Sequence, residues 1–208
     1  MLSLFVQRTL TSCILIALFT LLCYLPPLIF SLLLAAILAS ILHYEWPRLC
    51  PYAGYPGFLI TLFYPIAPFA LMIYMNEYYH TPYIQMLMIV ASFDAGAYVI
   101  GSLCGAHPLL PRISPGKTWE GVGGGLLCAA VTLFLLKTYY ANFTNITFPL
   151  LLALCTTALV GDLFESWLKR RAGVKDSAQI LPGHGGFLDR FDSHMAAIVL
   201  LYAVRRWL

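Results

Sequence analysis

Charged residues are scarce in this chain of 208 residues. Asp, Glu, Lys and Arg together make up 10% of the sequence, whereas a soluble domain carries about 25%. Hydrophobic residues make up 61%, and the mean hydropathy is +0.82. This composition excludes an ordinary soluble domain. The long apolar runs instead predict a polytopic integral membrane protein.

Paired cysteines are also lacking. The six cysteines include no Cys-x-x-Cys pair, and five of them lie in or at the ends of apolar runs, where cysteine behaves as a small hydrophobic residue. Neither a disulfide framework nor a zinc site is therefore expected. The net charge of +3 is uninformative by itself, and we expect no nucleic-acid partner.

The apolar runs predict an all-α fold of about seven transmembrane helices. The first run ends at Tyr24 and has no small-residue cleavage site after it, so it is expected to be a retained span and not a signal peptide. Pro65 and Pro68 should kink the third helix. After the first run, the expected helices cover residues 28–46, 58–75, 83–104, 121–140, 148–168 and 193–207.

The distribution of Lys and Arg predicts the orientation in the membrane. Nine of the twelve fall on one side of the expected spans, which places the N-terminus and the loops 107–120 and 169–192 in the cytoplasm. Three basic residues fall on the other side. These are Lys137, Arg205 and Arg206.

One stretch, residues 161–193, concentrates the charge of the molecule. It holds five of the nine acidic residues and five of the twelve basic ones, around a glycine-rich turn. Mixed charge around such a turn, in an apolar protein, is typical of metal-dependent phosphate chemistry. The charged residues are Asp162, Glu165, Lys169, Arg170, Arg171, Lys175, Asp176, Asp189, Arg190 and Asp192.

Acidic residues inside a membrane span are costly and favour a functional interpretation. Asp94, Asp162 and Glu165 are of this kind. Asp162 and Glu165 also share one helix face with Ser166 and Lys169, because the spacing is i, i+3, i+4 and i+7. The alternative is a polar stripe that only holds helices together.

The carboxylates of Asp189 and Asp192 are spaced i, i+3 at the start of the last expected helix. Their whole role could be to stabilise the start of the helix, where the helix dipole favours negative charge, with Asp192 or Ser193 as the N-cap. Alternatively, Asp162, Asp189 and Asp192 could hold magnesium, which takes few carboxylates and prefers phosphates at its other positions. The preceding glycines could present N–H groups to an anion. The cations that would then hold phosphates are Lys169, Arg170, Lys175 and Arg190.

The loop 107–120 is a second basic and hydroxyl-rich segment, with Ser114, Lys117 and Thr118 as candidate nucleotide-binding residues. It resembles a P-loop only superficially, because it lacks the first glycine and the preceding strand. An ordinary cytoplasmic loop is an equal alternative. His184 is isolated, so a donor that stabilises the turn is at least as reasonable as a metal ligand.

The C-terminal pattern resembles the signature of the phosphatidate cytidylyltransferases, also called CDP-diacylglycerol synthases. It runs Ser166-x-Leu-Lys-Arg170, Lys175-Asp176-x-Ala, then Leu181-Pro-Gly-His-Gly-Gly-Phe-x-Asp-Arg-Phe-Asp192. Asp94-x-x-Ala-Tyr98 and the segment 114–121 are similar to upstream motifs of that family. Leu25-Pro-Pro27 and Glu45-Trp46 are similar to its N-terminal helices. The chain is shorter than is usual there, by roughly a helical hairpin between Trp46 and Tyr83.

The resemblance implies a single integral-membrane domain over residues 1–208, with N-terminal helices to residue 90 and a catalytic half over 91–208. It implies transfer of CMP from CTP to phosphatidate, giving CDP-diacylglycerol and pyrophosphate. It also implies Mg²⁺ on Asp162, Asp189 and Asp192, and an active site that faces the cytoplasm of a bacterial inner membrane. A homodimer is left open. The remaining expected site residues are Ser114, Lys117, Thr118, Lys169, Arg170, Lys175, Asp176, His184, Gly185, Gly186 and Arg190.

Two other functions stay open on the sequence. A polyprenol or phytol kinase also uses CTP in the membrane, but that class lacks this C-terminal signature. A cation-coupled transporter would use Asp94, Asp162 and Glu165 as an ion path, but it would need charge spread across the membrane. Here the three acids lie toward the expected cytoplasmic half.

Overall fold

The computed structural model describes residues 21, 26–50, 54–139, 146–180 and 185–207. The expected first span lies outside these ranges, apart from Leu21. The chain divides into two compact units. Unit 1 contains residues 1–77 and 168–191, and unit 2 contains residues 78–167 and 192–208. The single domain expected over residues 1–208, with halves that meet near residue 90, stays a prediction.

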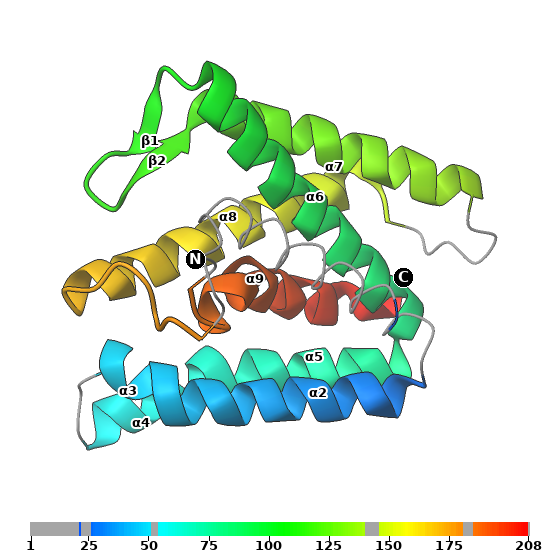
Figure 1. The fold of residues 1–208 in the computed structure, drawn as a ribbon. Helices are drawn as coiled ribbons and strands as arrows, with labels where there is room; N and C mark the ends of the chain where they lie inside the picture. Colours follow the sequence, from blue (N-terminus) through cyan, green and yellow to red (C-terminus); the bar gives the residue numbers. More distant parts are fainter. Residues whose placement is uncertain (1–20, 22–25, 51–53, 140–145, 181–184, 208) are drawn as a thin grey trace, which may run out of the picture. The chain divides into compact units, whose positions relative to one another are not determined.

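Unit 1 is built around two long helical segments, which we call the first rod (Pro27–Leu49) and the second rod (Tyr55–Tyr78). Each rod is interrupted by a π-helical turn. Asn76 fastens the rods together, because its amide donates to the carbonyl oxygen of Pro27 at 2.7 Å and to the hydroxyl oxygen of Ser31 at 2.9 Å. Figure 1 shows α2 and α5 side by side. The elements are α2 (Pro27–Ser40), η1 (Ile41–Glu45), α3 (Trp46–Leu49), α4 (Tyr55–Thr61), η2 (Leu62–Ile66) and α5 (Ala67–Tyr78).

Prolines explain both interruptions. The N–H of Trp46 bonds the carbonyl of Ile41, five residues back, directly before Pro47, which has no N–H to contribute. The first rod thus continues to Leu49, three residues beyond its expected end. In the second rod, Tyr64 has φ −152° and ψ 102°, the extended conformation that a following proline imposes. The expected kink at Pro65 is confirmed.

Unit 2 contains the longer helices and a small sheet. The antiparallel strands β1 and β2 lie in the segment expected to be a loop, and Trp119 continues the pairing by donating its N–H to the carbonyl of His107. The elements are α6 (His80–Cys104), β1 (Pro108–Leu110), β2 (Ser114–Thr118), α7 (Trp119–Tyr139), most of α8 (Phe148–Arg171), most of α9 (Leu188–Val204) and η3 (Arg205–Trp207).

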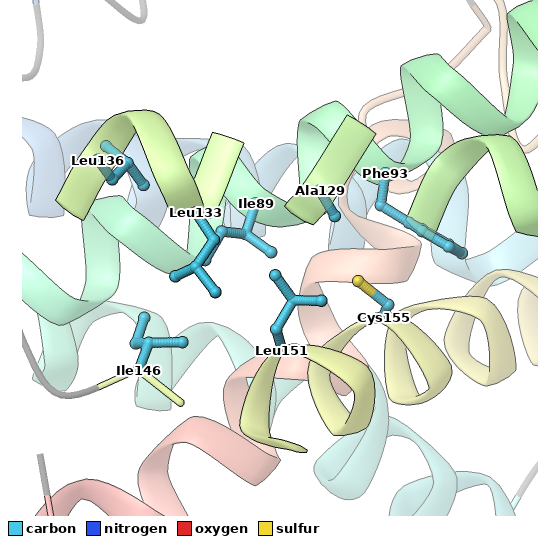
Figure 2. Packing of buried hydrophobic residues seen from close by; sticks show 8 residues of the cluster. All are labelled: Ile89, Phe93, Ala129, Leu133, Leu136, Ile146, Leu151 and Cys155. Carbon is cyan, nitrogen blue, oxygen red and sulfur yellow. The ribbon is translucent and has the colours of Figure 1, made fainter. Parts of the chain in front are cut away.

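The core of unit 2 lies where α6, α7 and α8 meet. Figure 2 shows side chains from the three helices, and from the residue at 146, pointing toward one another. Close packing of this kind contributes about 1.5–3 kcal/mol per large apolar side chain removed from water. The buried residues are Ile89, Phe93, Ala129, Leu133, Leu136, Ile146, Leu151 and Cys155.

Five helical segments are long and apolar enough to cross a membrane. The all-α fold class is confirmed, and the chain is a membrane protein. The expected total of about seven spans is not confirmed, because among the described residues the remaining helix, α9, is not one of the candidates. The five segments are Pro27–Leu49, Tyr55–Tyr78, His80–Cys104, Trp119–Tyr139 and Phe148–Arg171.

Candidate active site

A cavity of about 180 Å³, lined by apolar and charged residues, lies in unit 2, between α6, α7, α8 and strand β2. Asp94 from α6, Lys117 from β2 and Asp162 from α8 all line it. The ammonium group of Lys117 pairs with the carboxylate of Asp162, and the hydroxyl of Ser166 lies 3.4 Å from the other oxygen of that carboxylate. We call the space lined by Asp94, Lys117 and Asp162 the open cavity. It brings Lys117 of the loop 107–120 beside Asp162 of the expected acidic site, and the role of that loop in binding a nucleotide stays a prediction.

The glycine in the Gly161-Asp162 pair has a spatial reason. A Cβ at Gly161 would lie 2.6 Å from the Cβ of Ala196 and 2.7 Å from the carbonyl oxygen of Asp192, so only glycine lets α8 and α9 come this close. This contact brings Asp192 into the neighbourhood of the open cavity. Asp94 interacts electrostatically with both Asp162 and Asp192, and also with Lys117.

The hairpin is anchored to the start of α7 by two short side chains. The hydroxyl of Thr118 accepts the N–H of Gly121 at 3.1 Å, as an N-cap does. The carboxylate of Glu120 accepts the N–H groups of Ala106 and His107 at 3.2 Å each. These bonds hold β2 against α7 and thereby fix the backbone from which Lys117 reaches into the cavity. Ser114 starts the same strand and is half-buried.

A second polar cluster lies in unit 1 and is centred on Asp189. Its carboxylate accepts hydrogen bonds from Lys169 Nζ at 2.7 Å and from the N–H of Gly186 at 2.8 Å. It also accepts the N–H of Ser177 at 3.1 Å, and the hydroxyl of Ser177 lies 2.9 Å from it. Both carboxylate oxygens are thus engaged by donors of the protein itself.

Glu45 completes this cluster from the end of η1. Its side chain is fully buried, and it accepts the N–H groups of Phe187 at 2.8 Å and Leu188 at 2.9 Å. Ser177 donates to it at 2.7 Å. We call Glu45, Lys169, Ser177 and Asp189, with the backbone N–H groups of residues 186–188, the closed network. Anion-binding N–H groups were expected at this turn, and carboxylates of the same chain occupy them.

Opposing effects act on the Asp189 carboxyl, which lies outside the five candidate spans. Burial by itself raises the pKa of this group. The hydrogen bonds from Lys169, Gly186 and Ser177, together with the charge of Lys169, outweigh burial and hold the pKa below its ordinary value. Asp189 is therefore ionised at neutral pH and forms a buried ion pair with Lys169.

The start of α9 differs from the expected one. The helix begins at Leu188, so Asp192 and Ser193 lie inside it and neither can be the N-cap. The first N–H groups are instead satisfied by Glu45, which comes from a distant part of the sequence. The expectation that Asp192 or Ser193 caps the helix is wrong, because apolar periodicity gave too late a start.

The other expected site residues are more exposed. Lys175, Asp176 and Arg190 are exposed, and Arg170 lies 3.4 Å from the carbonyl of Val174 in a weak, exposed contact. Gly185 has a positive φ of 82°, and a Cβ there would lie 2.6 Å from an Asp189 oxygen. His184 lies outside the described residues. The roles of these residues toward a substrate stay predictions.

The expected magnesium ligands are Asp162, Asp189 and Asp192. Within the described ranges, no three His, Cys, Asp or Glu side chains are grouped so that they could hold a metal ion. Asp162 and Asp192 belong to unit 2, whereas Asp189 belongs to unit 1 and has both oxygens engaged. The carboxylates have the right chemistry for magnesium, and their role as its ligands stays a prediction.

Two residues of these clusters, Glu45 and Asp94, are absent from the site that the sequence predicts. Glu45 was not counted among the acids inside spans, although it lies in an apolar segment and the same criterion would have selected it. Asp94 was recognised as such an acid but was not placed in the site. The structure puts it on the open cavity, opposite the motif residues Lys117 and Asp162.

Comparison with known proteins identifies the family. The model of the cytidylyltransferase family matches residues 47–208. The chain belongs to the cytidylyltransferase family. The resemblance stated from the sequence is confirmed, and the matched range includes both the open cavity and all of the closed network except Glu45.

Several curated relatives of this cytidylyltransferase-family chain are named phosphatidate cytidylyltransferase. The protein of Haemophilus influenzae is 42% identical over 156 residues, which cover 67% of this chain and 54% of the relative. The protein of Mycobacterium leprae is 41% identical over 65% of this chain and 43% of the relative. That of Staphylococcus epidermidis is 47% identical over 55% and 45%. The chain thus spans about half the length of the curated relatives it matches.

Proposed function

We propose that this chain is a phosphatidate cytidylyltransferase, which forms CDP-diacylglycerol and pyrophosphate from CTP and phosphatidate. The observation that supports this most is the open cavity, in which a lysine and two aspartates meet within the segment that matches the family. The names of the relatives support the same substrates. The membrane-spanning helices suit a substrate whose phosphate lies at the level of the lipid headgroups.

The proposed reaction makes limited demands on the protein. A phosphate oxygen of phosphatidate attacks the α-phosphorus of CTP, a new P–O bond forms, and the bond to the β-phosphate breaks as pyrophosphate leaves. The nucleophile is already anionic, so the site needs positioning and charge neutralisation more than a strong base. Lys117 is the proposed binder of a phosphate oxygen, once its ammonium group is released from Asp162. The exposed cations Arg170, Lys175 and Arg190 are further candidates.

Magnesium is proposed as the cofactor, with Asp162, Asp189 and Asp192 as its candidate ligands. When bound, the ion would neutralise phosphate charge. Asp189 is engaged by four donors of the protein itself, so no step of the reaction is assigned to the ion. Chelation followed by addition of magnesium should abolish and then restore activity, and full activity in the chelator would contradict the proposal.

We also propose that the site faces the cytoplasm of a bacterial inner membrane, where CTP is available. A cysteine introduced by Gln179→Cys in a cysteine-free background should react only with reagents that reach the cytoplasm. Reaction from outside alone would contradict this orientation. A homodimer stays a prediction.

One assay tests the function. Purified protein is given magnesium, CTP labelled in the cytosine ring and phosphatidate, and the lipid extract is examined for labelled CDP-diacylglycerol. A parallel reaction contains γ-labelled CTP with a polyprenol or phytol in place of phosphatidate. Labelled CDP-lipid supports the proposal. A labelled phosphorylated alcohol without CDP-lipid would indicate a kinase instead.

A further inference from the structure

We propose that Glu45 is a positioning residue, which holds residues 186–188, where the last glycine of the signature leads into α9, in the arrangement that cytidylyl transfer requires. This inference rests on the proposed function for its catalytic consequence. The contacts themselves are independent of that function. Glu45 belongs to the N-terminal part of the resemblance, but neither the C-terminal signature nor the expected site includes it, and it lies two residues before the matched range.

Burial and hydrogen bonding show that Glu45 is bound to this place. A carboxylate with no exposed surface is strongly unfavourable unless donors compensate it. Glu45 has three such donors within 2.9 Å, namely the N–H groups of Phe187 and Leu188 and the hydroxyl of Ser177. Two of them are the first N–H groups at the start of α9, which would otherwise be unpaired.

The backbone at Gly186 is shaped around this carboxylate. A Cβ on Gly186 would lie 2.4 Å from an oxygen of Glu45 and 2.2 Å from the hydroxyl oxygen of Ser177. No other residue fits there without displacing the carboxylate. The glycine of the signature therefore has a steric reason that involves a residue about 140 positions earlier in the chain.

Ser177 connects Glu45 to the signature aspartate. Its hydroxyl oxygen lies 2.7 Å from Glu45 and 2.9 Å from Asp189, but it has only one proton to donate. The two carboxylates therefore share one hydroxyl. A shift of Glu45 would move both the turn and the side chain of Asp189, and Arg190 follows directly. Misplacement of about 1 Å at a distance from the reacting atoms can reduce turnover about a hundredfold.

The test compares Glu45→Gln with Glu77→Gln, a matched change at an exposed glutamate of the same unit. Gln keeps the size of Glu but puts an NH₂ group where one oxygen accepted an N–H. We expect hydrogen exchange at the amides of Phe187 and Leu188 to become about tenfold faster or more. We also expect kcat to fall about tenfold or more, with the KM for CTP within about threefold of wild type. Glu77→Gln should change none of these.

Each arm has an outcome that overturns the inference. Unchanged exchange at both amides would show that Glu45 does not hold the turn. Faster exchange with an unchanged kcat would show that the hydrogen bonds of Glu45 stabilise residues 187 and 188 but have no catalytic role. A wild-type protein that makes no CDP-lipid would overturn the proposed function, and the exchange rates alone would then still decide whether Glu45 holds the turn.

Ser177→Ala keeps the inference testable if Glu45→Gln does not fold. It removes the shared hydroxyl and leaves the buried carboxylate with its two backbone donors. We expect a smaller effect in the same direction, about threefold on kcat and on exchange of the same amides. Values within error of wild type on both measurements would contradict the proposal.

Discussion

The closed network and the open cavity use the same residue types for opposite purposes. In the closed network, donors of the protein engage the oxygens of Glu45 and Asp189, and the chain is held together there. By contrast, Asp94, Lys117 and Asp162 line the open cavity, where the carboxylate of Asp162 accepts from the side chains of Lys117 and Ser166. A carboxylate that is saturated by its own protein stabilises the fold, whereas one beside open space is available to a ligand.

The largest effect should come from a matched pair of substitutions, Asp162→Asn and Asp189→Asn. We expect each to lower activity about a hundredfold or more, because each removes a charge from the proposed site. Only Asp189→Asn should also lower stability, by about 1–3 kcal/mol, since the new NH₂ group faces donors of the closed network. Activity assays and thermal unfolding in detergent measure the two effects. Equal melting temperatures for the two variants would contradict the distinction between the clusters.

The next effect concerns space within the closed network. Gly186→Ala should lower stability by about 1–3 kcal/mol and reduce activity strongly, because the added methyl group overlaps Ser177 and Glu45. Gly123→Ala is the matched control on α7, where nothing lies within 4 Å of the added methyl group. That control should be neutral or more stable, since Ala is favoured over Gly in a helix by about 1 kcal/mol. Similar losses in both variants would indicate that the crowding at Gly186 is relieved by movement.

Lys117→Ala also tests the open cavity, with a smaller expected loss of activity. It should lower kcat/KM for CTP by more than about tenfold, because removal of a cation that binds phosphate costs about 1.5–3 kcal/mol. Folding should be little affected, since the pair with Asp162 is partly exposed. Lys137→Ala, at the far end of α7, serves as the control. Near-normal use of CTP by Lys117→Ala would return the hairpin to a purely structural role.

The smallest effect should come from Thr118, whose hydroxyl caps α7 beside the open cavity. Thr118→Ser should be close to wild type, because serine is an equally good cap. Thr118→Ala should lower the free energy of unfolding by about 1 kcal/mol. If the hydroxyl also binds CTP, Thr118→Ala will raise the KM for CTP while Thr118→Ser does not. Unfolding curves and steady-state kinetics of both variants separate the two roles.

The sequence predicted the features that depend on composition and local pattern. The apolar runs located the helices because spanning a membrane requires about 20 apolar residues, and the kink at Pro65 follows from the chemistry of proline. The motif residues Lys117 and Asp162 were both selected, and their side chains pair with one another, while their role toward a substrate stays a prediction. In contrast, the hairpin at 108–118 was expected to be a loop, because its strands are short and rich in Gly, Pro and Ser.

What could not be predicted is which partner each polar group finds. The glycine turn suggested an anion, and the sequence cannot show that the anion is Glu45, some 140 residues away. The saturation of Asp189 is hidden for the same reason. A motif names the residue types at a site, but hydrogen-bond saturation depends on long-range contacts that local patterns do not encode.

The π-helical turn η1 changes the direction in which side chains point along the first rod. An α-helix advances by about 100° per residue, so the one extra residue in a π-turn rotates everything after it by that angle relative to everything before it. Residues 27–40 and residues 46–49 therefore do not belong on one helical wheel. A relative that lacked one residue between positions 41 and 45 could form an uninterrupted helix of the same composition. In that relative, the glutamate equivalent to Glu45 would point to a different side of the rod unless the preceding helix turned to compensate.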